Sequence, residues 1–563
     1  MINDSQIQSV IDRVMSELHH PEPGSHGPRP KPVVGREPPP PSASVRHGDN
    51  LFPDVDTAVE AGRTAYRQLQ DLPLSIREQM IAHIRRTMRE NAQTLAFEAW
   101  QESGMGRYED KIEKILLNAD KSPGTEYLTT TAWTGDAGLT VVEYAPYGLI
   151  GSIIPSTNPI STVISNTICM VSAGNAVVFN AHPGARASSN RAVQLVNDAI
   201  IEAGGPANLV SAIAEPTIES ATALMGHRGV SILTVTGGGG VVKAAMASGK
   251  RAICGGPGNP PVVVDETADI QKAGRDIVRG ASFDNNIICT DEKETFAVAS
   301  IADELKRAMC AHGAVEIDAA QLEQLKKSIF TEVPPRGRYG TMSREFIGKN
   351  ANVLLDAIGV DAGDEVRLII AEVDPDDPLV FSEQMMPIHP LVRVRDGNEG
   401  IDLSKAAEHG FRHTAVMHSK NLDNLSRMAR VMDCSIFVKN GSSFDGLGYG
   451  GEGYCSFTIA SPTGEGVTSP ISFSRIRRCV LKDYFRIVYP PADPAGPRPG
   501  RFFQYRVRHR GGRRHGKEGS DRHDPCRHRA AWPLSRAHRG SGGGRGRIAC
   551  SGARSRWLKR ARL

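Results

Sequence analysis

Apolar residues near the N-terminus recur with the spacing of one helical face. They predict a short amphipathic helix over residues 4–18, whose apolar stripe consists of Ile7, Val10, Ile11, Val14, Met15 and Leu18. The proline-rich segment 21–46 that follows predicts an extended linker. Because this linker separates residues 1–20 from the next domain, we expect the stripe to be buried elsewhere. A helix that folds back on its own chain or frays is the alternative.

From residue 47 onward, strand-like apolar runs alternate with helical patterns. Residues 51–106 are helical in pattern, and Ser75 with Glu78 predicts a capping box at the start of one helix. The parallel sheet and crossover helices typical of nucleotide-binding domains are predicted by the runs VVEYAP, GLIGSIIP, NAVVFNA and VSILTVTG. A second α/β series runs from PPVVVDE to SIFVKNG. We therefore expect an α/β fold with two lobes and a cleft between them.

The composition limits the compartment and the kind of site. The chain has 563 residues, 40% of them hydrophobic, which is enough for two packed domains. No run approaches the roughly 20 apolar residues of a membrane span, and the N-terminus lacks the order of a secretory signal. The nine cysteines are scattered without the spacing of a zinc site. We expect a cytoplasmic protein with reduced thiols, no membrane contact and no metal.

The net charge of +4 is unevenly distributed along the chain. Residues 489–563 contain 20 Lys or Arg residues against 4 Asp or Glu residues, so the remainder of the chain is acidic. This basic segment has no apolar periodicity, and we expect a disordered tail without a function of its own. Binding of nucleic-acid bases on Phe502, Phe503 and Tyr505 is the alternative, although we expect no specific nucleic acid.

Two short segments carry candidate chemistry. Cys289 closes the run GASFDNNIIC, and a cysteine thiolate can attack an aldehyde, lose hydride to a nicotinamide and hold the acyl group as a thioester. Thr236 and Gly237 begin a glycine run that ends a strand and opens a helix, where backbone N–H groups can approach a pyrophosphate. This run lacks the G-x-G-x-x-G spacing, so a tight turn explains it equally well when it is taken alone.

Four separated blocks together resemble one enzyme family. They are SIIPSTNPIST, GGPGNPPVVVDETADI, GASFDNNIIC and SEQMMPIHPLVRV. In this order they resemble the CoA-acylating aldehyde dehydrogenases of the propanediol- and ethanolamine-utilisation type, and the resemblance extends from about Leu51 to Val488.

The resemblance implies an aldehyde dehydrogenase-like organisation. An NAD-binding parallel-sheet lobe is expected over residues 47–254, an α/β catalytic lobe over residues 255–434, and a return to the cofactor lobe over residues 435–488. Oligomerisation segments are expected near residues 128–147 and within the return segment, in a homodimer or homotetramer.

The resemblance also implies roles for individual residues. Cys289 is expected to be the nucleophile, and the side-chain amide of Asn158 to help bind the substrate oxyanion. An Asn-Pro pair is otherwise a simple turn. The implied cofactor-binding residues are Pro155, His182, Thr236, Gly237 and Glu383. Glu383 would bind the nicotinamide ribose, although a lone glutamate is ordinarily solvated. His182 follows the strand where hydrolytic members offer a lysine to the adenosine ribose, which leaves NAD or NADP open.

Gly255 indicates how the acyl group leaves. Hydrolytic aldehyde dehydrogenases carry a water-activating glutamate near this place, and glycine cannot activate water. The implied reaction is oxidation of propionaldehyde or acetaldehyde to acyl-CoA, with NAD+ and coenzyme A. The alternatives are a hydrolytic aldehyde dehydrogenase that forms the free acid, and a non-catalytic cargo or nucleic-acid-binding protein.

The predicted N-terminal helix resembles the encapsulation peptide of bacterial microcompartment enzymes. Residues 4–18 are therefore expected to bind shell or cargo proteins by laying the apolar stripe into a groove. This implies a location in the lumen of a microcompartment within the cytoplasm.

Overall fold

The computed structural model describes residues 50–486. The expectations for residues 1–20, for the linker at 21–46 and for the basic segment 489–563 lie outside the described residues and remain predictions.

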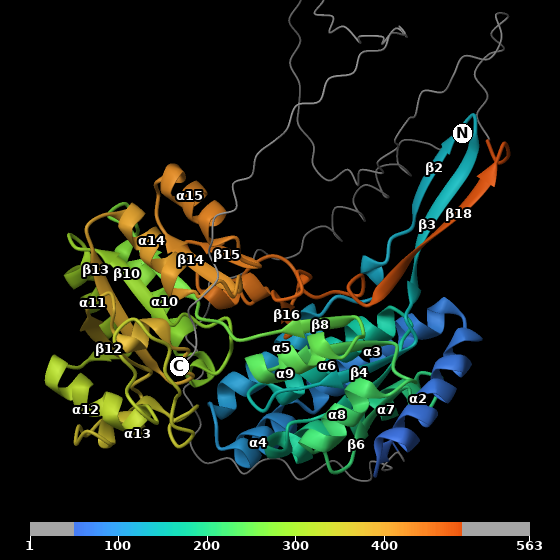
Figure 1. Cartoon of the computed structure of the whole chain (residues 1–563), viewed down its shortest axis with the longest axis horizontal. Coiled ribbons are helices and arrows are strands. Elements are labelled where there is room, and N and C mark those ends of the chain that lie inside the picture. The colour runs from blue at the N-terminus through green and yellow to red at the C-terminus, as the bar shows by residue number, and fades with distance from the viewer. Residues whose placement is uncertain (1–49, 487–563) are drawn as a thin grey trace, which may run out of the picture. The chain divides into compact units, whose positions relative to one another are not determined.

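The first lobe is built on a six-stranded parallel sheet (Figure 1). Its strands, in spatial order, are β1 (Leu51–Phe52), β6 (Val210–Ile213), β5 (Ala176–Asn180), β4 (Leu149–Ile153), β7 (Ile232–Thr236) and β8 (Ala252–Gly255). The central strands β4 and β5 are buried on both faces, which explains why they read as unbroken apolar runs. The helices of this lobe are α2 (Val55–Gln70), α3 (Leu74–Glu90), α4 (Ala92–Ser103), α5 (Tyr108–Lys121), α6 (Pro159–Ser172), α7 (Arg186–Glu202), α8 (Ile218–Gly226) and α9 (Gly239–Ala247).

The strand order of this sheet reverses next to β4. From β4 the chain continues outward through β5 to β6, and then crosses back to place β7 on the other side of β4. In open parallel sheets, ligands bind in the crevice outside the carboxyl ends of the strands at such a reversal. The topology therefore places a binding site after β4 and β7.

The second lobe has a seven-stranded parallel sheet. In spatial order it contains β11 (Ala314–Glu316), β12 (Leu368–Val373), β13 (Ile388–Val394), β10 (Glu294–Val298), β9 (Pro261–Val264), β14 (Thr414–His418) and β15 (Ile436–Lys439). The accompanying helices are α10 (Ile270–Ala281), α11 (Ala302–Cys310), α12 (Ala319–Ile329), α13 (Ala351–Asp356), α14 (Gly397–Ala407) and α15 (Leu422–Met432). Two parallel sheets with helices between their strands confirm the α/β prediction.

Short 3-10 turns connect several elements: η1 (Thr125–Tyr127), η2 (Pro183–Ala185), η3 (Phe283–Asn286), η4 (Pro378–Phe381) and η5 (Ser443–Leu447). A two-stranded antiparallel pair joins β16 (Ile459–Ala460) to β17 (Gly466–Val467).

A three-stranded antiparallel ribbon brings together segments from both halves of the sequence. Its middle strand β3 (Gly138–Pro146) pairs with β2 (Thr131–Gly135) and with β18 (Ser474–Lys482). Figure 1 shows the three strands running together as one extended ribbon. Most of β18 is exposed, including Ile476 and Val480, at 71% and 60%. The ribbon coincides with the two segments expected to oligomerise, and an oligomer itself remains a prediction.

Three local expectations differ from the structure. Helix α3 begins at Leu74 after Pro73, without a side-chain cap, so the capping box predicted at Ser75 is wrong. The run VVEYAP lies in the antiparallel ribbon, not in a parallel sheet, because it pairs with β2 and β18. The expected boundary at residue 434 falls before β15, which pairs with β14 and extends the second sheet to Lys439.

Candidate active site

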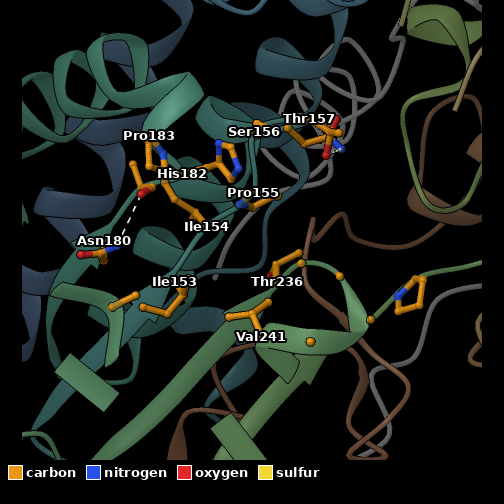
Figure 2. A pocket seen from close by; sticks show the side chains of 18 of the residues that line it. Ile153, Ile154, Pro155, Ser156, Thr157, Asn180, His182, Pro183, Thr236 and Val241 are labelled. Carbon is orange, nitrogen blue, oxygen red and sulfur yellow. Dashed lines mark hydrogen bonds between the residues drawn. The ribbon is translucent and has the colours of Figure 1, made fainter. Parts of the chain in front are cut away.

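A cavity of about 780 Å³ lies at the carboxyl ends of β4, β5 and β7. Residues that follow these strands line it together with residues of the second lobe. Figure 2 shows Pro155 and His182 across the cavity from Thr236 and Val241. All of the residues predicted from the sequence line this one cavity, namely Pro155, Asn158, His182, Thr236, Gly237, Cys289 and Glu383. The structure thus brings together side chains that the sequence separates widely.

Cys289 follows a strained turn. The 3-10 turn η3 precedes it, and three successive residues there have positive φ angles: Asp284 at 45°, Asn285 at 56° and Asn286 at 64°. Residues other than glycine rarely adopt this backbone conformation, so the surrounding contacts must hold the turn in place. Burial and then the negative charge of Glu383 raise the pKa of the Cys289 thiol to about 12. The thiol therefore carries its proton at neutral pH in this state.

The side chain of Lys293 contacts the same turn. Its side chain is buried, and Nζ donates hydrogen bonds to the backbone oxygen of Asn286 at 2.9 Å and to the side-chain oxygen of that residue at 2.5 Å. Ile288 O lies 3.4 Å from the same nitrogen. The positive charge of Lys293 also opposes the rise in the Cys289 pKa.

Asn158 caps the N-terminus of α6, where Pro159 begins the helix. Its side chain is buried and faces the cavity beside Cys289. The amide Nδ2 has only long contacts within the protein, 3.3 Å to Thr157 Oγ1 and 3.5 Å to Ile287 O. Nδ2 is therefore available to donate to a ligand oxygen in the cavity that Cys289 also lines.

The turn between β7 and α9 fits a pyrophosphate. Gly238 occupies the N-cap of α9, and a Cβ atom added at Gly238, Gly239 or Gly240 would meet nothing within 4 Å. Bare backbone N–H groups at a helix N-terminus favour phosphate oxygens. Thr236 ends β7, and its Oγ1 shares a 2.8 Å hydrogen bond with Thr458. The residues present therefore fit a dinucleotide.

Glu383 supplies the carboxylate of the cavity. Its Oε1 accepts a hydrogen bond of 3.3 Å from the backbone N–H of Gly258, and burial raises its pKa. Among the described residues that line the cavity, no other carries a carboxylate. Arg344, from the second lobe, places a positively charged guanidinium group in the lining. Burial and, to a smaller extent, the positive charge of Arg344 lower the pKa of His182, so its imidazole is neutral at pH 7.

The position of Gly255 corrects one step of the sequence argument. Gly255 ends β8 and does not line the cavity, whereas Gly256 and Pro257 do. A Cβ atom at Gly255 would point at the backbone of Ile459, 3.2 Å from its oxygen. A glutamate side chain there would leave the backbone toward Ile459, from a position outside the lining. The case against a hydrolytic base rests instead on Glu383, the single carboxylate among the described lining residues, being the residue expected to bind the cofactor ribose.

Several other segments of interest lie outside the cavity lining. His389, His413 and His418 are buried, and burial lowers the pKa of each. The glycine-rich segment 439–453 does not contribute to the lining. Over residues 50–486, no cluster of His, Cys, Asp or Glu is arranged to hold a metal ion. Among the helices in that range, none combines the length and the apolar character needed to cross a bilayer.

The family model for the aldehyde dehydrogenase family matches residues 41–457. The chain belongs to the aldehyde dehydrogenase family. It is 48% identical over 447 residues to the acetylating acetaldehyde dehydrogenase EutE of Salmonella typhimurium strain LT2, covering 79% of this chain and 95% of that enzyme.

Two solved aldehyde dehydrogenases have the same fold. A propionaldehyde dehydrogenase of Rhodopseudomonas palustris, with bound CoA and an acylated cysteine, superposes with a TM-score of 0.75 at 46% identity, covering 77% of this chain and 98% of that one. A propionaldehyde dehydrogenase from the fucose-utilisation microcompartment of Clostridium phytofermentans gives a TM-score of 0.75 at 45% identity, covering 78% and 100%. The aldehyde dehydrogenase fold, with one parallel sheet in each of its two lobes, is thereby confirmed.

Proposed function

We propose that Cys289 of this CoA-acylating aldehyde dehydrogenase is the residue that carries the acyl group. The observation that supports this role is the shared cavity, in which Cys289 lies beside Asn158 and faces the cofactor turn at Thr236 and Gly237. The S–H bond of Cys289 breaks as its sulfur bonds to the aldehyde carbon, the proton passes to solvent in the cavity, and a thiohemiacetal alkoxide is left. The β7–α9 turn would hold NAD+, which would supply the hydride acceptor for the resulting carbon. Cys289 then holds the acyl group as a thioester.

Asn158 stabilises the charge that forms during addition. Its Nδ2 and the backbone N–H of Cys289 donate to the new alkoxide oxygen, and each such donor is commonly worth about 3 kcal/mol. Pro155 and His182 line the cofactor side of the cavity, and Glu383 binds the ribose hydroxyls so that the nicotinamide faces Cys289. These roles are what the residues present can do in this arrangement.

The thioester is released by the thiol of coenzyme A. Glu383 is the single carboxylate among the described residues of the lining, and the proposal already uses it to bind the ribose hydroxyls. A hydrolytic reaction would need this same carboxylate as its base, so water is disfavoured. The non-catalytic alternative does not explain why a nucleophile, an oxyanion donor and a dinucleotide turn share one cavity. We propose propionaldehyde or acetaldehyde as the substrate, since relatives that act on each are similar to this chain.

Assembly and location extend the proposal beyond the active site. Pairing of the exposed β18 edge with a partner subunit would bury Ile476 and Val480 in a homodimer or homotetramer. Residues 4–18 would bind microcompartment shell or cargo proteins, a proposal supported by the microcompartment origin of one structural relative. Fusing residues 1–20 to a fluorescent protein in shell-producing cells tests this directly. Punctate fluorescence is expected, and diffuse fluorescence would place the signal elsewhere.

The decisive experiment compares Cys289→Ala with Cys310→Ser. Cys310 is an exposed thiol at the end of α11, so its substitution should leave turnover unchanged. Cys289→Ala should abolish NADH formation while NAD+ binding persists, because only the nucleophile is removed. The wild type should form acyl-CoA when CoA is present and little free acid when it is absent. Turnover by Cys289→Ala, or free acid at an equal rate without CoA, would overturn the assignment.

A further inference from the structure

Two buried lysines lie in a cluster that contacts Asn158 on the side away from its Nδ2 atom. Lys111 and Lys114 are one turn apart on α5, and both side chains contact the carboxylate of Asp284 in the turn before Cys289. The side chains of Lys111 and Lys114 are 6% and 3% exposed, and that of Asp284 is fully buried. Lysines are almost never buried to this extent without a specific partner. The cluster joins the first lobe to the turn that carries the nucleophile.

Lys114 alone of the two lysines also reaches the active site. Its Nζ donates a hydrogen bond of 2.6 Å to Oδ1 of Asn158, in addition to its contact with Asp284 Oδ2. An ammonium group only donates hydrogen bonds, so the Asn158 atom that faces it must be the carbonyl oxygen. The amide nitrogen is thereby turned to the opposite side, where its contacts to Thr157 and Ile287 are long.

Asp284 fixes the position of Lys114 in turn. Its Oδ1 accepts a 2.7 Å hydrogen bond from the backbone N–H of Arg107, and its Oδ2 accepts one of 3.1 Å from Lys111 Nζ. The backbone N–H of Asp284 donates to Asp110 Oδ2 at 2.9 Å. The carboxylate is therefore anchored from several sides and leaves Lys114 little freedom to rotate away from Asn158.

We propose that Lys114 is a positioning residue, which holds the Asn158 amide in the orientation that presents Nδ2 to the oxyanion. The proposal rests on the proposed function of Asn158 as an oxyanion donor. Without Lys114 the amide can rotate by half a turn and present its carbonyl oxygen, which repels a developing negative charge. The buried cation acts through Asn158 and does not itself touch the substrate.

The test is a double-mutant cycle between Lys114→Met and Asn158→Ala. Lys114→Met should lower kcat for aldehyde-dependent NADH formation by about 10- to 100-fold, less than the roughly 100- to 1,000-fold loss when an oxyanion donor is removed outright, because the freed amide still adopts the productive orientation part of the time. In the Asn158→Ala background, adding Lys114→Met should cost less than twofold, because no amide is left to orient. The rate at which iodoacetamide alkylates Cys289 should stay within twofold in Lys114→Met, since that reaction forms no oxyanion.

Lys111→Met is the matched control. Lys111 contacts Asp284 without reaching Asn158, so this variant should lose less than threefold in kcat. Lys114→Met leaves Asp284 paired with Lys111, which avoids an orphaned buried charge and favours a folded protein. If that variant does not fold, Lys114→Gln enters the same cycle.

The outcomes separate the two proposals. An unchanged kcat in Asn158→Ala would overturn the oxyanion role of Asn158 itself. A reduced kcat in Asn158→Ala, together with losses that multiply in the double variant, would overturn the positioning role of Lys114 alone. A loss of alkylation rate in Lys114→Met would also overturn it, because the damage would then lie in the nucleophile turn.

Discussion

Replacing Gly258 with alanine tests whether the nucleophile turn tolerates displacement. Gly258 lies against Cys289, and a Cβ atom added there would be 2.4 Å from the backbone oxygen of Cys289 and 3.2 Å from Cγ of His413. Real Cβ atoms do not approach a backbone oxygen this closely, so the turn must move by roughly 1 Å to relieve the overlap. A shift of about 1 Å in an active site can cost about 100-fold in rate.

We therefore expect Gly258→Ala to lower kcat for acyl-CoA formation by about 100-fold. Overpacking should also lower the free energy of unfolding by about 1 to 3 kcal/mol, measured by urea denaturation. Gly226→Ala is the matched control, because a Cβ atom at Gly226 would meet nothing within 4 Å. A Gly258→Ala enzyme with kcat within twofold of the wild type would refute the claim that the turn is rigidly held.

Three further predictions concern charges in and behind the cavity. Glu383→Gln should speed alkylation of Cys289 by iodoacetamide at pH 8, because the Glu383 charge raises the pKa of that thiol; slower alkylation would contradict the sign. Burial lowers the pKa of Lys111 from its ordinary 10.5 to about 8. At a pH between these two values, the Lys111 amine is protonated in the unfolded chain but largely neutral in the folded one, so the unfolded chain binds more protons. Stability of the wild type relative to Lys111→Met should consequently rise by up to about 3 kcal/mol from pH 7.5 to pH 10.5 in urea titrations, and a fall would contradict it. Arg344→Ala should raise KM for NAD+ about tenfold with little change in kcat, because Arg344 is the one guanidinium among the described lining residues and its charge acts on His182 at the cofactor side. Steady-state kinetics with an unchanged KM would show that Arg344 does not contact a cofactor phosphate.

The parallel sheets could be predicted because their strands are buried on both faces. The apolar runs of β4 and β5 therefore stand out in the sequence. The antiparallel ribbon could not be separated from them by pattern alone, since β3 is equally strand-like. Its pairing depends on β18, far along the chain. The capping box at Ser75 failed because α3 begins two residues earlier than that cap requires, directly after Pro73.

Of the cavity residues, Cys289 could be predicted from the chemistry of its own side chain. Asn158 and the cofactor-binding residues could be predicted only because their sequence blocks resemble those of a known family, and they too line the cavity. Lys114 could not be found in this way, because a lysine in a helix is ordinarily solvated and its contact with Asn158 spans 44 residues. The direction in which Gly255 faces also depends on packing against Ile459, which sequence spacing does not reveal.

The ribbon has a consequence for the order in which the protein is made. Strand β3 leaves the ribosome early and has β2 as its neighbour, whereas β18 is synthesised only after the strands of both lobes. Closing so long a loop is slow and costs chain entropy, so the nine-residue β18 joins β3 late in folding. Any contact between subunits that depends on this third strand must wait until both lobes have been translated. Any assembly through β18 would thereby be delayed until each chain already contains both lobes.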